Sequence, residues 1–264
     1  MFGVVYSIAR TTVAEAMRRK ILMIILLIAV LVLAIAPALT ILSPRSERSV
    51  LIGLTLGVIQ LTSALISITL TVYLIPNEIE RRTIYTILCK PVLRWQFVVG
   101  KFLGAIGALA IMMGLMTAVL LGVYAIQQRV YDPQQLGVLV KAPVMYFVQM
   151  SLLAAVAMFF STFVSPIVNF FLSSGVYMLG TVFNPFFQTI QENPNTPAVA
   201  QKIAWFVNAV LPNFANYNVQ NPIINPGQVI QNETTYYLGA SAYGLVYIAI
   251  LLMAGMVIFE KREV

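Results

Sequence analysis

The sequence predicts an all-α membrane protein that crosses the bilayer six times. Of the 264 residues, 60% are hydrophobic and only 9% are charged, whereas a soluble domain carries about 25% charged residues. Apolar runs of about 20 residues, the length that a helix needs to cross the hydrocarbon core, recur along the chain. We therefore expect one transmembrane domain over residues 1–264. Its six spans are predicted at about 21–42, 50–75, 97–126, 142–163, 167–187 and 237–259.

The segment before the first span predicts an N-terminal interfacial helix. Its apolar residues recur at helical spacing opposite Arg10 and Glu15, which is typical of a helix lying in the membrane interface. These residues are Phe2, Val5, Ile8, Ala9, Val13, Ala16 and Met17. Three basic residues, 18–20, then precede the run "ILMIILLIAVLVLAIAPALTIL". This run is longer than the apolar region of a signal peptide, about 7–15 residues, and therefore predicts a retained helix.

The distribution of basic residues predicts the orientation. With the N-terminus inside, eleven of the sixteen Lys and Arg residues fall on the inner side. The other five are Arg45, Arg48, Arg129, Lys141 and Lys202. Because inner loops carry the excess of Lys and Arg, we expect both termini to be cytoplasmic, in the cell inner (plasma) membrane. The net charge of +7 then favours contact with anionic membrane lipids, and we expect no nucleic-acid partner.

The loop before the last span, roughly residues 188–236, predicts an outer amphipathic helix. In "AVAQKIAWFVNAVL", residues 198–211, one face is apolar. The following "LPNFANYNVQNPIINPGQ" is rich in Asn and Pro and predicts irregular structure. One hypothesis is that this helix caps the exit from the membrane, and the alternative is that it only anchors the loop. The residues of this possible outer gate are Trp205, Phe206, Leu211 and Pro212.

Several kinds of chemistry are disfavoured by what the spans lack. No span places an ionisable residue near its centre, which argues against a proton-coupled carrier. There is no His, and Cys89 is the only cysteine, so an intramembrane metalloprotease and an internal disulfide are also disfavoured. No phosphate-binding loop is present. We therefore expect no catalytic residue, metal or cofactor in this chain, and any nucleotide to be bound by another chain.

The stretch between spans two and three, "NEIERRTIYTILCKPVLRWQFVVGK" (77–101), holds five of the sixteen basic residues. Glu78 and Arg82 lie four residues apart and can pair along a helix. Lys90 precedes Pro91, which ends that helix, and a second short helix from Val92 leads into the third span. These residues suit docking to a protein or lipid surface. The alternative is a solvated turn anchored in lipid.

Residues 78–104, "EIERRTIYTILCKPVLRWQFVVGKFLG", resemble the signature loop of ABC-2-type permeases, the membrane subunits of ATP-driven exporters. The recurring residues of that family match Glu80, Thr83, Lys90-Pro91, Arg94 and Gly100-Lys101. The N-terminal helix, the six spans, "LPNF" (211–214) and the "FEKRE" tail agree with the resemblance.

The resemblance implies a cytoplasmic coupling helix that rests in a groove of an ATP-binding subunit, which would bind ATP and Mg. The coupling residues are then Glu78, Glu80, Arg81, Arg82, Thr83, Ile84, Ile87, Leu88, Lys90, Pro91 and Arg94. It also implies a second permease chain, expected as a homodimer. The uncharged spans favour lipid-like or amphipathic cargo. Two alternatives stay open: an assembly or maturation factor coupled to an ATPase, and an ATP-independent carrier or channel.

The start of the third span carries small residues four apart, at Gly100, Gly104 and Ala108. This spacing permits close approach of another helix. We favour packing within one chain over a dimer seam.

Overall fold

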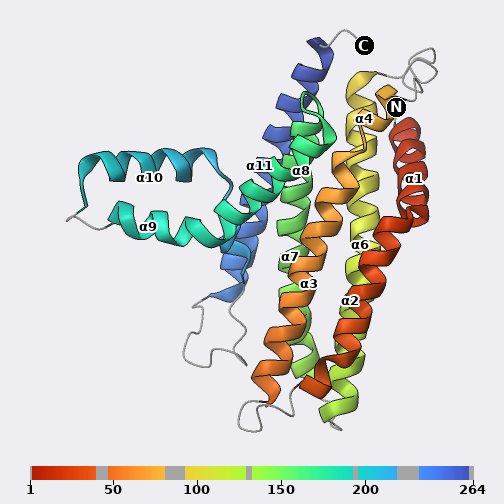
Figure 1. Ribbon diagram of the computed structural model, residues 1–264, viewed down its shortest axis with the longest axis vertical. Helices are drawn as coiled ribbons and strands as arrows, with labels where there is room; N and C mark the ends of the chain where they lie inside the picture. The colour runs from red at the N-terminus through yellow and green to blue at the C-terminus, as the bar shows by residue number, and fades with distance from the viewer. Residues whose placement is uncertain are drawn as a thin grey trace.

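The computed structural model describes residues 2–39, 47–80, 93–128, 133–192, 196–218 and 232–261, and all regular structure in these ranges is helical (Figure 1). Six of these helices are long and apolar enough to cross a membrane. The prediction of an all-helical protein with six long apolar helices is therefore confirmed.

The long helices run up and down in one bundle (Figure 1). They are α2 (Lys20–Leu39), α3 (Glu47–Val72), α6 (Arg94–Gln128), α7 (Pro133–Ser161), α8 (Pro166–Met178) with the π-helix η2 (Leu179–Phe183) that continues it, and α11 (Glu233–Lys261). α7 and α8 both begin at a proline, which is favoured at the first helical position because its missing N–H needs no partner there. Both ends of the chain lie at the same end of the bundle as the short helix α4 (Pro76–Glu80).

The centre of the bundle is α7. Residues 151–158 are buried without interruption, as expected for a helix that is surrounded on all sides. α3 and α11 pack against it. α2 and α8 carry many large exposed apolar side chains, such as Ile24 and Phe171, which suit contact with lipid or another apolar surface.

The N-terminal helix α1 (Phe2–Arg18) is confirmed as a helix, and it packs chiefly along the first turns of α6. Its predicted apolar stripe is therefore covered by a helix of the same chain. Thr12 and Ala16 of α1 are buried, and Thr12 faces Gly104 of α6. Its position relative to a membrane stays a prediction.

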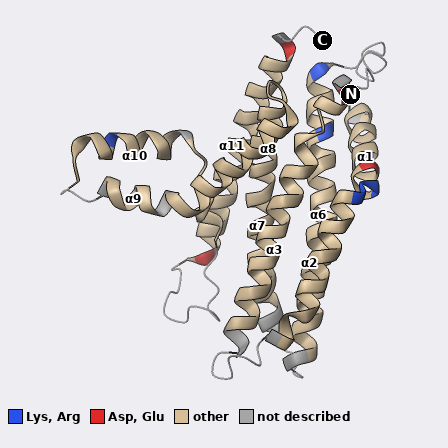
Figure 2. Cartoon of the chain, viewed as in Figure 1, with Lys and Arg blue, Asp and Glu red and all other residues tan. Residues whose placement is uncertain are grey.

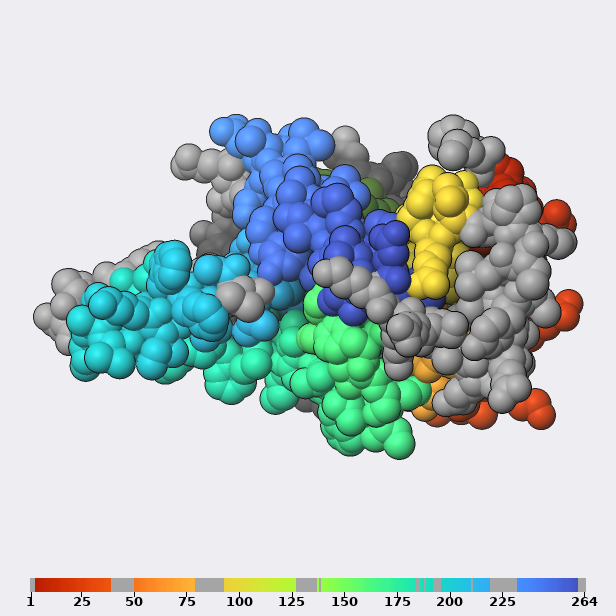
Figure 3. All heavy atoms as spheres, turned by 90° about the horizontal axis from the view of Figure 1, so that it is seen from above, coloured from red at the N-terminus to blue at the C-terminus, as the bar shows by residue number. Residues whose placement is uncertain are grey.

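A helical hairpin leaves the bundle after α8. A short π-helix, η2 (Leu179–Phe183), continues α8, and α9 (Asn184–Glu192) then turns away from it. α10 (Ala198–Val210) runs back along α9, and Figures 1 and 3 show the pair projecting from one side of the molecule. The sequence extended the fifth span to residue 187. The predicted span therefore covers α8, η2 and the first turn of α9, and Pro185 near the start of α9 is at a position where proline is favoured.

Candidate functional site

The predicted coupling segment begins where α3 ends. A turn at residues 73–75 leads into α4, and the Asn77 N–H donates to the Tyr73 carbonyl at 3.3 Å. At its other end, Arg94 begins α6, which is continuous to Gln128. The prediction of a separate second short helix is therefore wrong. The sequence from 94 to 101 contains no proline, so nothing forces a break before the third long helix.

Most of the predicted coupling residues lie outside the described part of the chain. These are Arg81, Arg82, Thr83, Ile84, Ile87, Leu88, Lys90 and Pro91, together with the side chain of Glu80. The structure describes the side chains of Glu78 and Arg94, the residues that flank this stretch. Both make contacts with other helices.

Lys101 is the centre of an ion-pair cluster that joins α1, α4 and α6. Its Nζ lies 2.6 Å from Glu78 Oε1 of α4 and 3.7 Å from Glu15 Oε2 of α1. The Lys101 side chain is only 7% exposed, against 18% for Glu78 and 46% for Glu15. A buried ammonium is costly unless it is paired. The two carboxylates therefore hold Lys101 inside and tie three helices to it.

Glycines on α6 let α1 approach closely at the same place. A Cβ at Gly104 would lie 2.5 Å from Thr12 Cβ and 2.7 Å from the Ala9 carbonyl oxygen. A Cβ at Gly100 would lie 2.9 Å from Ile8 Cβ. The prediction that these small residues pack within one chain is thus confirmed for Gly100 and Gly104. We call this region, formed by α1, α4 and residues 94–107 of α6, the junction.

Arg94 connects the start of α6 to the C-terminal end of α11. Its guanidinium donates to the carbonyls of Phe259 and Glu260, both at 3.1 Å, and lies 5.9 Å from the centroid of the Phe259 ring. Carbonyls at a helix C-terminus lack intrahelical partners and carry partial negative charge. The bond therefore suits a cation, and it links α11 to the junction.

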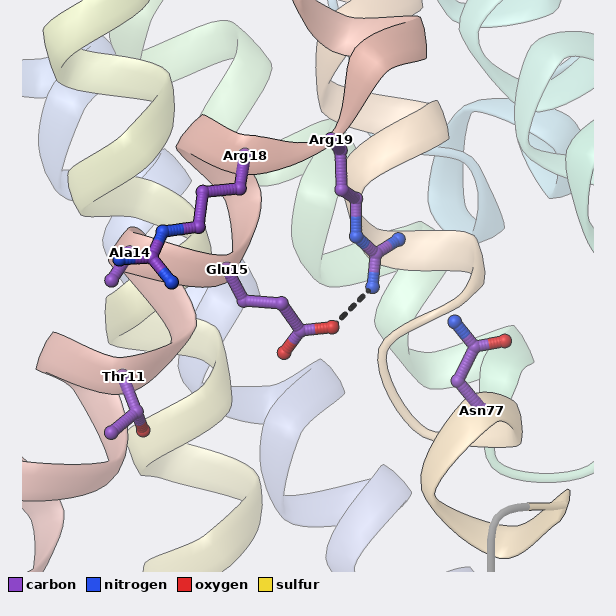
Figure 4. Close-up of a pocket in the computed structure, with 6 residues that line it drawn as sticks. All are labelled: Thr11, Ala14, Glu15, Arg18, Arg19 and Asn77. Atoms are coloured by element: carbon purple, nitrogen blue, oxygen red, sulfur yellow. Dashed lines mark hydrogen bonds and ion pairs between the residues drawn. The ribbon is translucent and has the colours of Figure 1, made fainter.

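A pocket opens between the C-terminal half of α1 and the start of α4 (Figure 4). Its volume is about 610 Å³, and its walls are Thr11, Ala14, Glu15, Arg18, Arg19 and Asn77. In Figure 4 the Arg19 side chain extends toward Asn77 and bonds Glu15, while Arg18 extends along α1. The Arg19–Glu15 distance is 3.0 Å. Among the described residues, no group of three or more His, Cys, Asp or Glu side chains could hold a metal ion.

The predicted outer gate residues are not gathered in one place. Trp205 and Phe206 of α10 are 60% and 61% exposed, and the main packing partner of α10 is α9. Leu211 is half-buried and Pro212 is buried, in the segment that leads back to the bundle. Whether these residues gate or anchor stays a prediction.

The contacts that fasten the hairpin to the bundle were not predicted from the sequence. We call residues 211–218 the return segment; its Phe214 and Tyr217 are fully buried. Gln149 of α7 donates to the Phe214 carbonyl at 3.0 Å, and the Tyr217 hydroxyl donates to the Ala240 carbonyl at 3.0 Å. Two glycines make room for these side chains, since a Cβ at Gly180 would lie 2.5 Å from the Phe214 ring and a Cβ at Gly244 would lie 2.5 Å from the Tyr217 hydroxyl oxygen.

Neutral polar side chains inside the bundle form hydrogen bonds from one long helix to another. Gln60 Nε2 of α3 donates to Gln149 Oε1 of α7 at 3.3 Å. Ser67 donates to the Met150 carbonyl at 2.8 Å, and Asn169 donates to the Ala157 carbonyl at 2.9 Å. Described charges lie toward the helix ends, as Figure 2 shows. The polar contacts between the spans are therefore hydrogen bonds between uncharged groups, and the described charged residues are concentrated at the junction.

The bundle of six long apolar helices defines a multi-pass membrane protein. A family model described as "ABC-2 family transporter protein" matches residues 6–264. The chain belongs to this family and is a membrane component of an ABC-2 transporter. Membrane subunits of this family lack ATPase activity themselves and generally pair with ATP-binding subunits. No curated protein matches the chain.

Proposed function

We propose that this chain is the permease subunit of an exporter driven by a separate ATP-binding subunit, which docks on residues 77–101. ATP and Mg are bound by that subunit. The observation that carries the proposal is the cluster at Lys101, because it ties the first turns of the proposed coupling segment to α1 and α6. Arg94 extends the same connection to α11.

The geometry supports a mechanical role for these contacts. A force applied to α4 reaches α6 through the 2.6 Å Lys101–Glu78 pair and α1 through Glu15. Because α1 packs on Gly100 and Gly104 with little free space, it moves with α6. When the ATP-binding subunits close, the long helices then tilt and change access to a cavity between two permease chains.

The orientation and partners complete the proposal. Both termini face the cytoplasm with the junction, in agreement with the basic residues in this region. A second copy of the chain covers part of the exposed apolar surface. The spans have neutral polar interiors, such as Gln60–Gln149, which suit lipid-like or amphipathic cargo better than small ions.

The experiment compares wild type with Arg94→Glu combined with Ile87→Asp, each purified with its ATP-binding subunit and reconstituted in vesicles. We expect stimulated ATP turnover and cargo movement to fall at least about tenfold, because Arg94→Glu faces the carbonyls at the end of α11 with a like charge and Ile87→Asp places a carboxylate at the proposed docking surface. Lys202→Glu, a charge reversal on exposed α10, is the control and keeps full activity. If the double variant binds its ATPase and stimulates it normally, residues 77–101 are not the docking site.

The same preparation separates the alternatives. Movement of labelled lipid across the vesicle membrane that depends on ATP identifies an exporter. ATP turnover that responds to a partner protein, without movement of any cargo, identifies an assembly or maturation factor. Transport that proceeds without the ATP-binding subunit identifies an ATP-independent carrier or channel.

A further inference from the structure

The pocket between α1 and α4 has an excess of positive charge. Glu15 is the only acidic residue among the described residues that line it, and that carboxylate already faces Arg19 at 3.0 Å and Lys101 at 3.7 Å. Arg18 is exposed and makes no ion pair or hydrogen bond with any described residue. The charge of Arg18 is therefore uncompensated within the described part of the chain.

Hydrogen-bond donors in the pocket fit an anion with several oxygens. A guanidinium carries five N–H donors, and the Arg19 contact with Glu15 uses one terminal nitrogen. The Asn77 side chain faces the Arg19 side of the pocket in Figure 4 and adds an amide donor. Arginine binds phosphate strongly because its planar donors match two phosphate oxygens.

An apolar track begins immediately beyond the pocket. α2 starts at Lys20, one residue after Arg19, and the first apolar span starts with it. One face of α2 exposes large apolar residues at helical spacing, namely Ile21, Ile24, Ile28, Leu31 and Ile35. An anionic group held at Arg18 would therefore lie at the end of a surface that suits an acyl chain.

We propose that this pocket binds the phosphate of an anionic phospholipid, with one acyl chain lying along α2. The shared chemistry is a phosphate group, which a lipid or free inorganic phosphate can supply, and the apolar track favours the lipid. Binding does not depend on the proposed function. Its consequence does: a lipid headgroup that reaches from the arginines of the pocket past Arg19 to Asn77 of α4 would steady the first turn of the coupling segment.

The test titrates the purified chain in neutral detergent with phosphatidylglycerol and, separately, with phosphatidylcholine of the same acyl chains. Bound lipid is counted by native mass spectrometry. We expect preferential binding of phosphatidylglycerol. Arg18→Gln lowers the apparent affinity for it about tenfold, as for loss of one hydrogen bond between charged groups. Lys202→Gln removes a charge from exposed α10 and leaves the affinity unchanged.

A second variant separates the pocket from a diffuse basic surface. Ala14 is exposed and lines the pocket, so Ala14→Trp fills the space while it keeps every charge. We expect it to weaken phosphatidylglycerol binding as strongly as Arg18→Gln does. Equal binding of the two lipids, equal losses in Arg18→Gln and Lys202→Gln, or full binding by Ala14→Trp overturns the proposal. Displacement of the lipid by a modest excess of inorganic phosphate identifies a free-phosphate site and overturns the lipid assignment.

Discussion

The junction and the return segment are both places where distant parts of the chain lock together, but they use different chemistry. At the junction a buried lysine meets two carboxylates. In the return segment two buried aromatic rings fit against glycines, and all the bonds are between neutral groups. In both regions a glycine permits a contact too close for any larger residue at that position. Only the junction also contains charged side chains.

The difference indicates which connection can respond to a partner. An ion-pair cluster interacts electrostatically with every other charge nearby, and the strength of its own pairs depends on how far water is excluded from it. Neutral hydrogen bonds each contribute about 1 kcal/mol and respond little to an approaching charged surface. We infer that the junction transmits a signal, whereas the return segment holds the hairpin to α7, α8 and α11 in a fixed shape.

The largest effect is expected from Lys101→Met. It leaves Glu78, which is mostly buried, without this cation, and breaking a buried pair costs about 3 kcal/mol or more. Glu15 is half-exposed, so its pair with Lys101 contributes little to the stability that is lost. We expect the free energy of unfolding, measured by SDS titration in mixed micelles, to fall by about 3 kcal/mol.

The matched variant is Glu78→Gln combined with Lys101→Met. Because the pair is then removed as a whole, the double variant regains part of the stability lost by Lys101→Met alone. Glu78→Gln alone completes the comparison. If the losses of stability in the two single variants simply add up in the double variant, Lys101 and Glu78 are not coupled, and the junction resembles the neutral return segment.

The second prediction compares glycines in the two regions. Alanine is favoured over glycine in a helix by about 1 kcal/mol. A methyl group at Gly104 would lie 2.7 Å from the Ala9 carbonyl oxygen, and one at Gly180 would lie 2.6 Å from the Pro212 carbonyl oxygen. Gly104→Ala and Gly180→Ala are therefore each expected to cost about 2 kcal/mol, as for overpacking of a tight contact.

Gly114→Ala is the control for both. A Cβ at Gly114 meets no atom within 4 Å, so this variant should be neutral or slightly more stable in the same SDS titration. A cost at Gly180 but none at Gly104 would mean that α1 yields easily. In that case it would not transmit movement of α4 to the bundle.

The sequence predicted the elements whose signal is local. Apolar runs located the six long helices, and helical periodicity located α1 and α10, because lipid and neighbouring helices demand these patterns directly. The small residues at 100 and 104 indicated close packing. They did not indicate that α1 was the partner, because the pattern on one helix does not identify the helix that faces it.

The ion pairs were harder to foresee. Glu78 was expected to pair with Arg82, which lies outside the described residues; the structure shows an ion pair between Glu78 and Lys101, 23 residues away, that the sequence did not indicate. A charged residue near a span end is normally assigned to the headgroup region, so nothing local marked Lys101 as buried. In the return segment, an Asn- and Pro-rich composition predicted irregular structure, and Phe214 and Tyr217 gave no separate indication that they enter the bundle.

The smallest effect is expected from Tyr217→Phe, which removes one neutral bond of the return segment and keeps the ring. Its hydroxyl donates to the Ala240 carbonyl at 3.0 Å, and loss of such a bond costs about 1 kcal/mol. Burial raises the pKa of Tyr217, and nearby Tyr243 and Tyr236 raise it further. A folded-state pKa above the unfolded value of about 10 favours the neutral form. The stabilisation is therefore complete below about pH 10 and is lost as the pH rises above it.

The measurement is the free energy of unfolding of wild type and Tyr217→Phe at neutral pH and at several alkaline values. Wild type should be more stable by about 1 kcal/mol at neutral pH. Above about pH 10 it should lose stability faster than the variant, because unfolding releases the Tyr217 proton. Parallel pH profiles would show that Tyr217 titrates alike in the folded and unfolded chain. The return segment would then be open to water, and its contrast with the junction would rest on the glycine contacts alone.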